Sequence, residues 1–489
     1  MLGDGDQRAT VWKTSAALTV ESGSSTVRRV IQRENDGVRW LLQPDFAPFL
    51  DALLKSPGQK VKESAVKQVT MHQVGEKTYY IKRYLHHAVP LRSWKFYFKT
   101  TQARQEWDLA LQLEARKIPI VRHVGLGERW TWSGVQESIL VTEGFDGVTL
   151  GMAPDVNLQA VLAFIEAMHG HGVLQTDLHP GNILVRREPF ELRLVDLHGT
   201  RVVSRISPKE RRENLAKLRM FLSIPVSDEI TALSHRLRQE FFQERSLRWI
   251  RRNRDFGQES HGGLQWRVRL PLLNKAVLMV LRDPDLFLSS RAHIIKPGRS
   301  STVGKADGLV LKRFNFRKVE SLIKDLFRPS RASRAFQSAY HLELLKIATA
   351  RPIAAADRHR WGFLRRSYLL TEEIHGGIDL GAFLRAGREP EPTLIQQAAR
   401  LIAKLHDEGF SHRDLKESNL IIGSDGRIYV IDLDGLKFLK TVSNHRSATD
   451  LERLLRGVNR HPVVTRRHRV LFLLGYCRAR KLRTIPRAD

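Results

Sequence analysis

A long-period internal repeat is the feature that most narrows how this chain of 489 residues can fold. Residues 167–178 align without gaps on residues 404–415, and the match continues to Asn182 and Asn419. Further matches upstream and downstream keep the same order along the chain, with a period near 237 residues. Chance does not order so many matches, so the sequence predicts a tandem duplication.

The repeat predicts two domains of similar length. The first covers residues 1–255 and the second covers residues 262–489, with a linker at residues 253–263. The linker segment is polar and rich in turn-forming residues, as a connection between domains should be. Each copy is long enough to enclose a hydrophobic core of its own.

Within each copy the spacing of apolar residues changes from strand-like to helix-like. Residues 79–84 and 309–314 carry the β-branched and aromatic residues that are typical of strands. Residues 158–169 and 394–406 have apolar side chains at helical spacing. Strands first and helices later predict an α+β fold, in which each copy has a small β-rich lobe and a larger helical lobe.

The balance of charge favours anionic partners. Lys and Arg number 81 against 52 Asp and Glu, which gives a formal net charge of +29. Arg248, Arg251 and Arg252 cluster beside Trp249, and residues 451–489 contain eleven basic and two acidic residues. Neither cluster forms a nucleic-acid-binding motif, so we expect an anionic membrane surface as partner and no nucleic acid. The alternative is a basic surface that is simply solvated.

Several classes of protein are excluded by other features of the composition. No apolar run approaches ~18 residues, so no transmembrane helix is expected. Cys477 is the one cysteine, which excludes a disulfide framework and an all-cysteine metal cage. The first residues do not resemble a secretory signal, and the cytoplasm is the simplest compartment. An aromatic and basic run at residues 94–99 is either a membrane anchor or a core segment.

Polar residues that could support chemistry recur at the same spacing in both copies. Each copy has an aspartate on a loop, an asparagine five residues later and a second aspartate about fourteen residues further. The three residues are Asp177, Asn182 and Asp196 in the first copy, and Asp414, Asn419 and Asp432 in the second. A hairpin of two short strands would place the asparagine beside the second aspartate. Their oxygens suit Mg²⁺, and the first aspartate is free to accept a proton from an attacking hydroxyl.

A lysine on an upstream strand, Lys82 or Lys312, could contact phosphates. This arrangement resembles that of protein-kinase-like phosphotransferases. Residues 412–419 match the catalytic-loop pattern of protein kinases, whereas residues 177–182 have the form seen in small-molecule and atypical kinases. Neither second aspartate is followed by Phe, so the chain is not a typical protein kinase.

The chain resembles the lipopolysaccharide core kinases, the Kdo and heptose kinase family of Gram-negative bacteria, in two copies. In the first copy the resemblance rests on residues 81–84, 94–95, 103–107, 118–121, 141–143 and the Asp177 loop. In the second copy it rests on residues 311–314, 327–332, 351–352, 370–373 and the Asp414 and Asp432 loops. The catalytic segments are shared by all kinase-like enzymes, so the part that concerns the substrate is less specific.

The resemblance implies a role for each of these residues. In the first copy it makes Lys82 the phosphate-binding lysine, Glu106 its helix partner and Asp177 the base. It places Mg²⁺ on Asn182 and Asp196. The same roles in the second copy fall on Lys312, Asp414, Asn419 and Asp432.

Each copy departs from the family pattern at one place. In the second copy the alignment puts Ala335 where Glu106 stands in the first. In the first copy the His-Arg pair before the catalytic aspartate is missing. Which copy is catalytic is therefore left open, as is the oligomeric state.

The resemblance implies an ATP-dependent and Mg²⁺-dependent kinase that phosphorylates a sugar hydroxyl of a lipopolysaccharide-type glycolipid. Such an enzyme would be cytoplasmic and peripheral at the inner face of the cytoplasmic membrane. Two alternatives remain. The loop at His412 would suit a Ser/Thr protein kinase, and the basic charge would suit a pseudokinase scaffold at the membrane surface.

Overall fold

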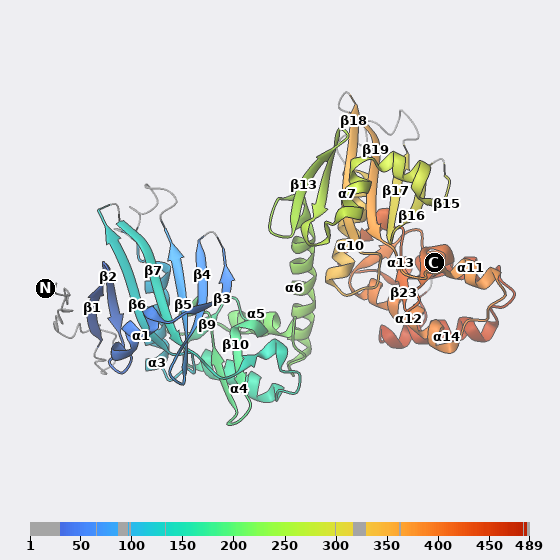
Figure 1. Ribbon diagram of the computed structural model, residues 1–489. Helices are drawn as coiled ribbons and strands as arrows, with labels where there is room; N and C mark the ends of the chain where they lie inside the picture. Colours follow the sequence, from blue (N-terminus) through green and yellow to red (C-terminus); the bar gives the residue numbers. More distant parts are fainter. Residues whose placement is uncertain are drawn as a thin grey trace. The chain divides into compact units, whose positions relative to one another are not determined.

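The computed structural model describes residues 30–486, with the exception of residues 65, 87–95, 97–98, 133, 299, 316–328, 361–362 and 483. The chain divides into two compact units, Met1–Leu237 and Arg238–Asp489, called here unit one and unit two. Each unit contains a large β-sheet of its own (Figure 1). Residues 94–95 and 327–328, which contribute to the family resemblance, and most of the run at 94–99 lie outside the described residues.

The division between the units differs from the predicted linker. It falls within helix α6 (Asp228–Ser246), and residues 253–263 instead contain strand β13 (Phe256–His261). This strand pairs with β14 (Leu264–Arg269) through a turn at Gly262 and Gly263, both at positive φ. Hairpin turns and linkers share a polar, glycine-rich composition, which is why the sequence alone did not separate them.

Unit one begins with an antiparallel sheet of seven strands in the order β1-β2-β6-β7-β5-β4-β3. The strands are β1 (Ile31–Asn35), β2 (Val38–Leu42), β3 (Gly58–Glu63), β4 (Lys67–Val74), β5 (Lys77–Leu85), β6 (His123–Thr131) and β7 (Gly134–Glu143). Alternate residues face opposite sides of the sheet. Ile139 and Val141 of β7 pack in the cluster that contains helix α1 (Leu50–Lys55). Leu140 packs with Trp107 of helix α3 (Gln102–Ala115).

Unit two repeats this sheet strand for strand, in the order β13-β14-β18-β19-β17-β16-β15. The further strands are β15 (His293–Lys296), β16 (Ser301–Ala306), β17 (Leu309–Asn315), β18 (Pro352–Arg360) and β19 (Phe363–Glu372). Helices α7 (Lys275–Arg282), α8 (Pro284–Leu286) and α10 (Arg331–Leu344) belong to the same part of the unit. The mixed helix and strand content and the two separate sheets confirm the predicted α+β class.

The second part of each unit is mainly helical. Unit one has α4 (Leu158–Gly170), α5 (Pro208–Arg219) and the first part of α6, and unit two has α11 (Leu380–Arg385), α12 (Pro392–Asp407), α13 (Asn444–Val458) and α14 (Arg466–Ala479). The amphipathic segments predicted at 158–169 and 394–406 are α4 and α12. The Asn157 side chain caps α4, and Pro392 occupies the first turn of α12, as both residues favour.

Short strands near these helices flank the loops that carry the polar motif. In unit one they are β8 (Val148–Thr149), β9 (Val173–Gln175), β10 (Ile183–Arg186), β11 (Glu191–Leu194) and β12 (Thr200–Val202). In unit two they are β20 (Ile378–Asp379), β21 (Phe410–His412), β22 (Leu420–Ile422), β23 (Ile428–Val430) and β24 (Leu436–Phe438). The hairpins β10–β11 and β22–β23 are those predicted from the sequence.

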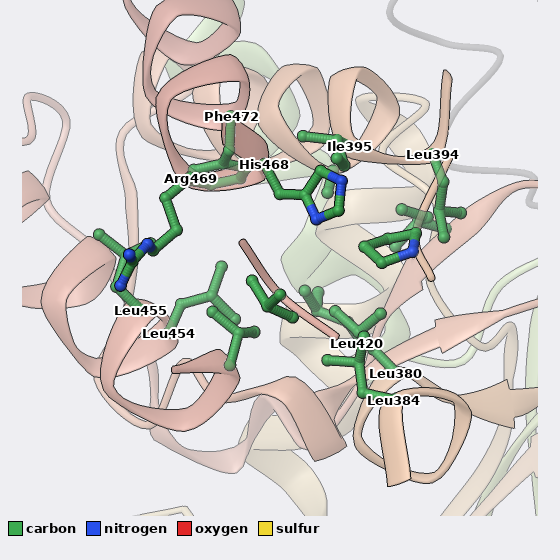
Figure 2. Close-up of a pocket in the computed structure, with 15 residues that line it drawn as sticks. Leu380, Leu384, Leu394, Ile395, Leu420, Leu454, Leu455, His468, Arg469 and Phe472 are labelled. Carbon is green, nitrogen blue, oxygen red and sulfur yellow. The ribbon is translucent and has the colours of Figure 1, made fainter. Parts of the chain in front are cut away.

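The helical core of unit two contains an apolar cavity of about 70 Å³ (Figure 2). Leu380 and Leu384 of α11, Leu454 and Leu455 of α13, and Phe472 of α14 line it, as Figure 2 shows. His468 and Arg469 of α14 are the two charged or titratable residues in its lining. Across the described part of the chain, no helix combines the length and the apolar character needed to cross a membrane.

His341 of α10 makes the stability of unit two depend on pH. Its ring lies 4.9 Å from that of Phe410 and 5.3 Å from that of Phe438, and its Nε2 has no hydrogen-bond partner among the described residues. Burial lowers the pKa of His341 from 6.5 to about 4. The unfolded chain therefore binds a proton that the folded chain does not, and stability falls as the pH drops from about 6.5 toward about 4.

We expect His341→Phe to reduce that fall by about 3 kcal/mol, the free-energy equivalent of the pKa difference. The measurement is the free energy of unfolding of unit two by urea at a series of pH values. Other titrating groups contribute equally in both proteins, so the difference between the two slopes isolates His341. An identical slope in the variant would contradict the prediction.

Candidate active site

Strand β5 and helix α3 bring Lys82 and Glu106 together in unit one. The Lys82 Nζ lies 2.6 Å from the Glu106 Oε1, and both side chains are largely buried. The Tyr84 hydroxyl lies 3.4 Å from the other carboxylate oxygen, and His123 Nε2 lies 3.5 Å from Oε1. Burial by itself would raise the pKa of Glu106, but Lys82 and His123 outweigh it and hold the pKa well below its usual range. Glu106 is therefore charged and holds the lysine in place.

Asp177 lies on the loop after β9, with its side chain 75% exposed. Asn182 Nδ2 donates to the backbone oxygen of Asp177 at 3.0 Å, so the loop is fixed while the carboxylate remains accessible. His179 Nε2 lies 3.9 Å from an Asp177 carboxylate oxygen. His179 also accepts a hydrogen bond from the Gly181 backbone at 3.0 Å, which is a loop-packing role.

Gln175 occupies the position of the missing catalytic-loop histidine. Its Nε2 donates to the backbone oxygen of Asp196 at 3.1 Å, and its Oε1 accepts from the backbone N–H of Asp177 at 3.1 Å. The equivalent His412 of unit two bonds through Nε2 to the backbone oxygen of Ile431 at 3.0 Å. Gln175 therefore links the two catalytic loops, although the family pattern has a histidine at this position.

Asp196 is held in the left-handed region with φ 58°, and Asp432 has φ 63° at the equivalent place. The Asp196 Oδ1 is buried and has no hydrogen-bond partner within the described part of the chain. Lys67 of β4 lies within electrostatic range of Lys82 and Asp196, and burial followed by the charge of Lys82 lowers the pKa of Lys67. Lys67 was not predicted from the sequence, because its place at the site depends on the pairing of β4 with β5, where it lies opposite Tyr84.

In unit two the strand lysine has different partners. Lys312 forms a short ion pair with Asp432 and lies 3.8 Å from the Asp434 Oδ1. Burial would raise the pKa of Asp432, but Lys312 holds it below its usual range. The other oxygen of Asp434 accepts from Arg331 Nε at 2.7 Å, with Arg331 Nη2 at 2.6 Å. Asp434 thus bridges the strand lysine and helix α10, a role that sequence analysis did not assign.

Helices α3 and α10 correspond residue for residue. Each has 14 residues and a side-chain cap, from Thr101 and Ser330, and the fifth residue is Glu106 in one and Ala335 in the other. The carboxylate that α3 supplies is therefore missing from α10. The tyrosine hydroxyl that contacts Glu106 in unit one is also absent, because Phe314 replaces Tyr84 at the matching strand position.

The Asp414 loop of unit two resembles the Asp177 loop in its backbone contacts. Asn419 Nδ2 donates to the backbone oxygen of Asp414 at 2.8 Å. Lys416 Nζ lies 2.9 Å from the Asp414 carboxylate, and this hydrogen bond raises the pKa of Lys416. Lys416 thus places a positive charge beside Asp414, which was not predicted from the sequence.

A buried polar residue supports each catalytic loop from the helix that follows. In unit one Asn214 Nδ2 donates to the Gln175 backbone oxygen at 2.6 Å. In unit two the Asp450 carboxylate accepts from the His412 backbone N–H at 2.9 Å and from the Ser411 hydroxyl at 2.8 Å. The repeat aligns Asn214 with Asp450, so their shared position was the available signal.

The same residues include groups that could hold a metal ion. Within the described ranges, no group of three or more His, Cys, Asp or Glu side chains could hold a metal ion alone. Mg²⁺ needs less, because it is commonly held by one or two protein oxygens together with phosphates and water. The unpartnered Asp196 Oδ1 and the amide oxygen of Asn182 fit that requirement in unit one.

Comparison with known proteins agrees with this geometry. The model of the lipopolysaccharide kinase (Kdo/WaaP) family matches residues 51–236 and 297–476, more than half of the chain and part of each unit. The chain belongs to this family. The family resemblance predicted from the sequence is thereby confirmed.

Individual members of the Kdo/WaaP family are similar over shorter stretches. The chain is 31% identical over 141 residues to a 3-deoxy-D-manno-octulosonic acid kinase of Vibrio parahaemolyticus, covering 28% of this chain and 58% of the relative. It is 33% identical over 89 residues to the lipopolysaccharide core heptose(II) kinase WaaY of Escherichia coli, covering 18% and 38%. The chain thus spans less than two thirds of the length of these relatives.

A solved structure of WaaP in complex with acyl carrier protein is 21% identical in sequence, with a TM-score of 0.30. The similarity covers 41% of this chain and 89% of that one.

Proposed function

We propose that the chain is an ATP-dependent kinase that phosphorylates a sugar hydroxyl of a lipopolysaccharide-type glycolipid, built from two kinase-like domains in tandem. One observation carries the proposal. A charged Lys82–Glu106 pair, a buried unpartnered Asp196 oxygen and an exposed Asp177 occur together in a chain of the Kdo/WaaP family. The seven-stranded sheets of the two units have the same strand order, which supports the tandem kinase-like architecture.

The residues of unit one would divide the work of phosphoryl transfer. Lys82 and Lys67 would bind the phosphates of ATP, and Asn182 with Asp196 would hold Mg²⁺. When bound, the metal neutralises charge that develops on the phosphoryl oxygens. The sugar hydroxyl oxygen forms a bond to the γ-phosphorus, the bond from that phosphorus to the bridging oxygen of ADP breaks, and the hydroxyl proton passes to Asp177.

Unit two offers the same set of groups with a different lysine partner. Lys312, Asp414, Asn419 and Asp432 would take the corresponding roles. The sequence His412-Arg413-Asp414, which is shared with the catalytic loop of protein kinases, favours a protein kinase activity in this unit.

The test of the proposed function is a transfer assay. The full chain is incubated with radiolabelled ATP, Mg²⁺ and lipopolysaccharide from a strain that lacks core phosphate, and label is followed in the glycolipid and in protein. Label in the glycolipid is the expected result. Label on protein Ser or Thr alone would contradict the sugar-kinase proposal in favour of a protein kinase.

We also propose that the enzyme is peripheral at the inner face of the cytoplasmic membrane. Trp249, beside the first basic cluster, is buried and stacks on Phe336 with ring centroids 4.5 Å apart. The arginines at 248, 251 and 252 remain exposed. Helix α14 adds exposed Val470 and Leu474, with exposed arginines at 466, 467 and 478 on the same helix.

We expect the chain to sediment with anionic vesicles at low salt and to be released by 0.5 M salt. Basic residues near an anionic surface each contribute about 1 kcal/mol, and salt screens that attraction. The triple variant Arg466→Glu, Arg467→Glu and Arg478→Glu should lower the bound fraction several-fold. Binding that is absent, or equal at both salt concentrations, would count against a peripheral location.

A further inference from the structure

Unit one contains a cavity of about 490 Å³ between helix α3 and the loop that follows Asp196. Its polar lining comes from Gln102, Gln105, Asp108 and Gln112 of α3, from His198 of the loop and from Thr200 at the start of β12. Side-chain amides, a carboxylate and a hydroxyl provide both donors and acceptors. This is the chemistry that recognises a polyhydroxylated ring, and the volume lies in the usual range of small-molecule sites.

The inner end of the cavity reaches the groups proposed to transfer phosphate. Lys67, Glu106 and Asp196 all line it. Gly199, another lining residue, accepts hydrogen bonds from the backbone N–H and the hydroxyl of Thr176, at 3.0 and 2.8 Å. Thr176 directly precedes Asp177, so the cavity ends beside the segment that carries the proposed base.

Unit two differs at two of the positions that line this cavity in unit one. Helix α10 begins with Arg331 where α3 begins with Gln102, and Asp434 stands two residues after Asp432 as His198 stands two after Asp196. Gln102 and His198 are both exposed. Arg331 and Asp434 instead form an ion pair at 2.6 Å, with the guanidinium 4.8 Å from the Phe314 ring centroid. In unit two this ion pair joins α10 to the loop after Asp432, whereas in unit one the cavity lies between α3 and the corresponding loop.

We infer that the cavity of unit one is the acceptor-sugar site and that the Arg331–Asp434 ion pair closes the equivalent place in unit two. The inference rests on the proposed function and assigns glycolipid phosphorylation to unit one. Unit two keeps the groups of the proposed nucleotide site, since Lys312 still pairs with Asp432.

The test transplants the ion pair into unit one. The double variant Gln102→Arg/His198→Asp, in the full chain, should lower the rate of glycolipid phosphorylation by about 100-fold or more, since a misplaced acceptor loses the aligned geometry that the reaction needs. Affinity for Mg²⁺·ATP, measured in the Asp432→Ala background so that only unit one binds, should stay within threefold. The matched control Gln159→Arg/His235→Asp makes the same substitutions at exposed helix positions of unit one and should keep the parent rate.

Asp108→Asn provides a second readout. Asp108 lines the cavity, and we expect its loss to raise the KM for the glycolipid about tenfold while the KM for ATP is unchanged. Parent-level phosphorylation by the folded double variant would overturn the acceptor-site inference alone. A parent chain that binds Mg²⁺·ATP but labels no glycolipid would overturn the proposed function and this inference together.

Discussion

Asp177→Asn lowers glycolipid phosphorylation by about 10²–10⁴-fold while Mg²⁺·ATP still binds, if Asp177 is the base of unit one. A sugar hydroxyl is a weak nucleophile, and a carboxylate at the reacting oxygen orients it and accepts its proton. The carboxylate is exposed, whereas the loop is held through the backbone oxygen of Asp177 by Asn182. The substitution therefore removes the base and leaves the loop contact intact. The measurement is the initial rate of label transfer together with ATP binding.

The matched control is Asp414→Asn, which makes the same change in the corresponding loop of unit two. It should leave glycolipid phosphorylation nearly unchanged if unit one transfers the phosphate. Loss of activity in Asp414→Asn with retention in Asp177→Asn would reverse the assignment of the two units.

Asp196→Ala removes Mg²⁺-dependent ATP binding from unit one only, and Asp432→Ala removes it from unit two only. The physical reason is that each aspartate has its own asparagine and its own strand lysine. The binding stoichiometry, measured by equilibrium dialysis with Mg²⁺·ATP, should fall from two nucleotides per chain to one in either variant. The double variant should bind none in the presence of Mg²⁺.

The two single variants differ in what they leave behind. In Asp196→Ala the Lys82–Glu106 pair at 2.6 Å remains, whereas Asp432→Ala removes the carboxylate nearest to Lys312 and leaves Asp434. Asp307→Asn, on an exposed turn at φ 54° that Asn also tolerates, serves as a control. Complete loss of nucleotide binding in either single variant would contradict a model with two independent sites.

Much of the fold could be predicted because its signals are local. The helical spacing at 158–169 and 394–406 and the hairpins after Asn182 and Asn419 depend on neighbours in the sequence, and the structure has all of them. The segment at 253–263 was misassigned because its composition suits a linker and a hairpin turn equally. The fate of Trp249 also depended on a distant partner, since Phe336 of α10 covers its ring.

The candidate site divides in the same way. The spacing of Asp177, Asn182 and Asp196 identified the loops and their chemistry, and the missing carboxylate at Ala335 was visible from alignment of the two copies. The groups that replace the missing histidine and the missing carboxylate could not be identified from the sequence. Gln175 takes over a histidine's hydrogen bond to the second loop, and Asp434 takes over a helix carboxylate's contact with the lysine.

The repeat, the two lobes of each copy and the identity of the polar groups could all be predicted before folding, because these follow from composition and short-range spacing. The hydrogen-bond and ion-pair partners of those groups depend on how distant elements pack in the folded chain. Arg331 and Asp434 are 103 residues apart in the chain, and their ion pair exists only because α10 packs beside the loop after β23. In unit two a side chain of the helix and a side chain of the loop form an ion pair, whereas in unit one the helix and the loop line a cavity. This difference depends on a contact between residues far apart in the sequence, so no local sequence pattern could predict it.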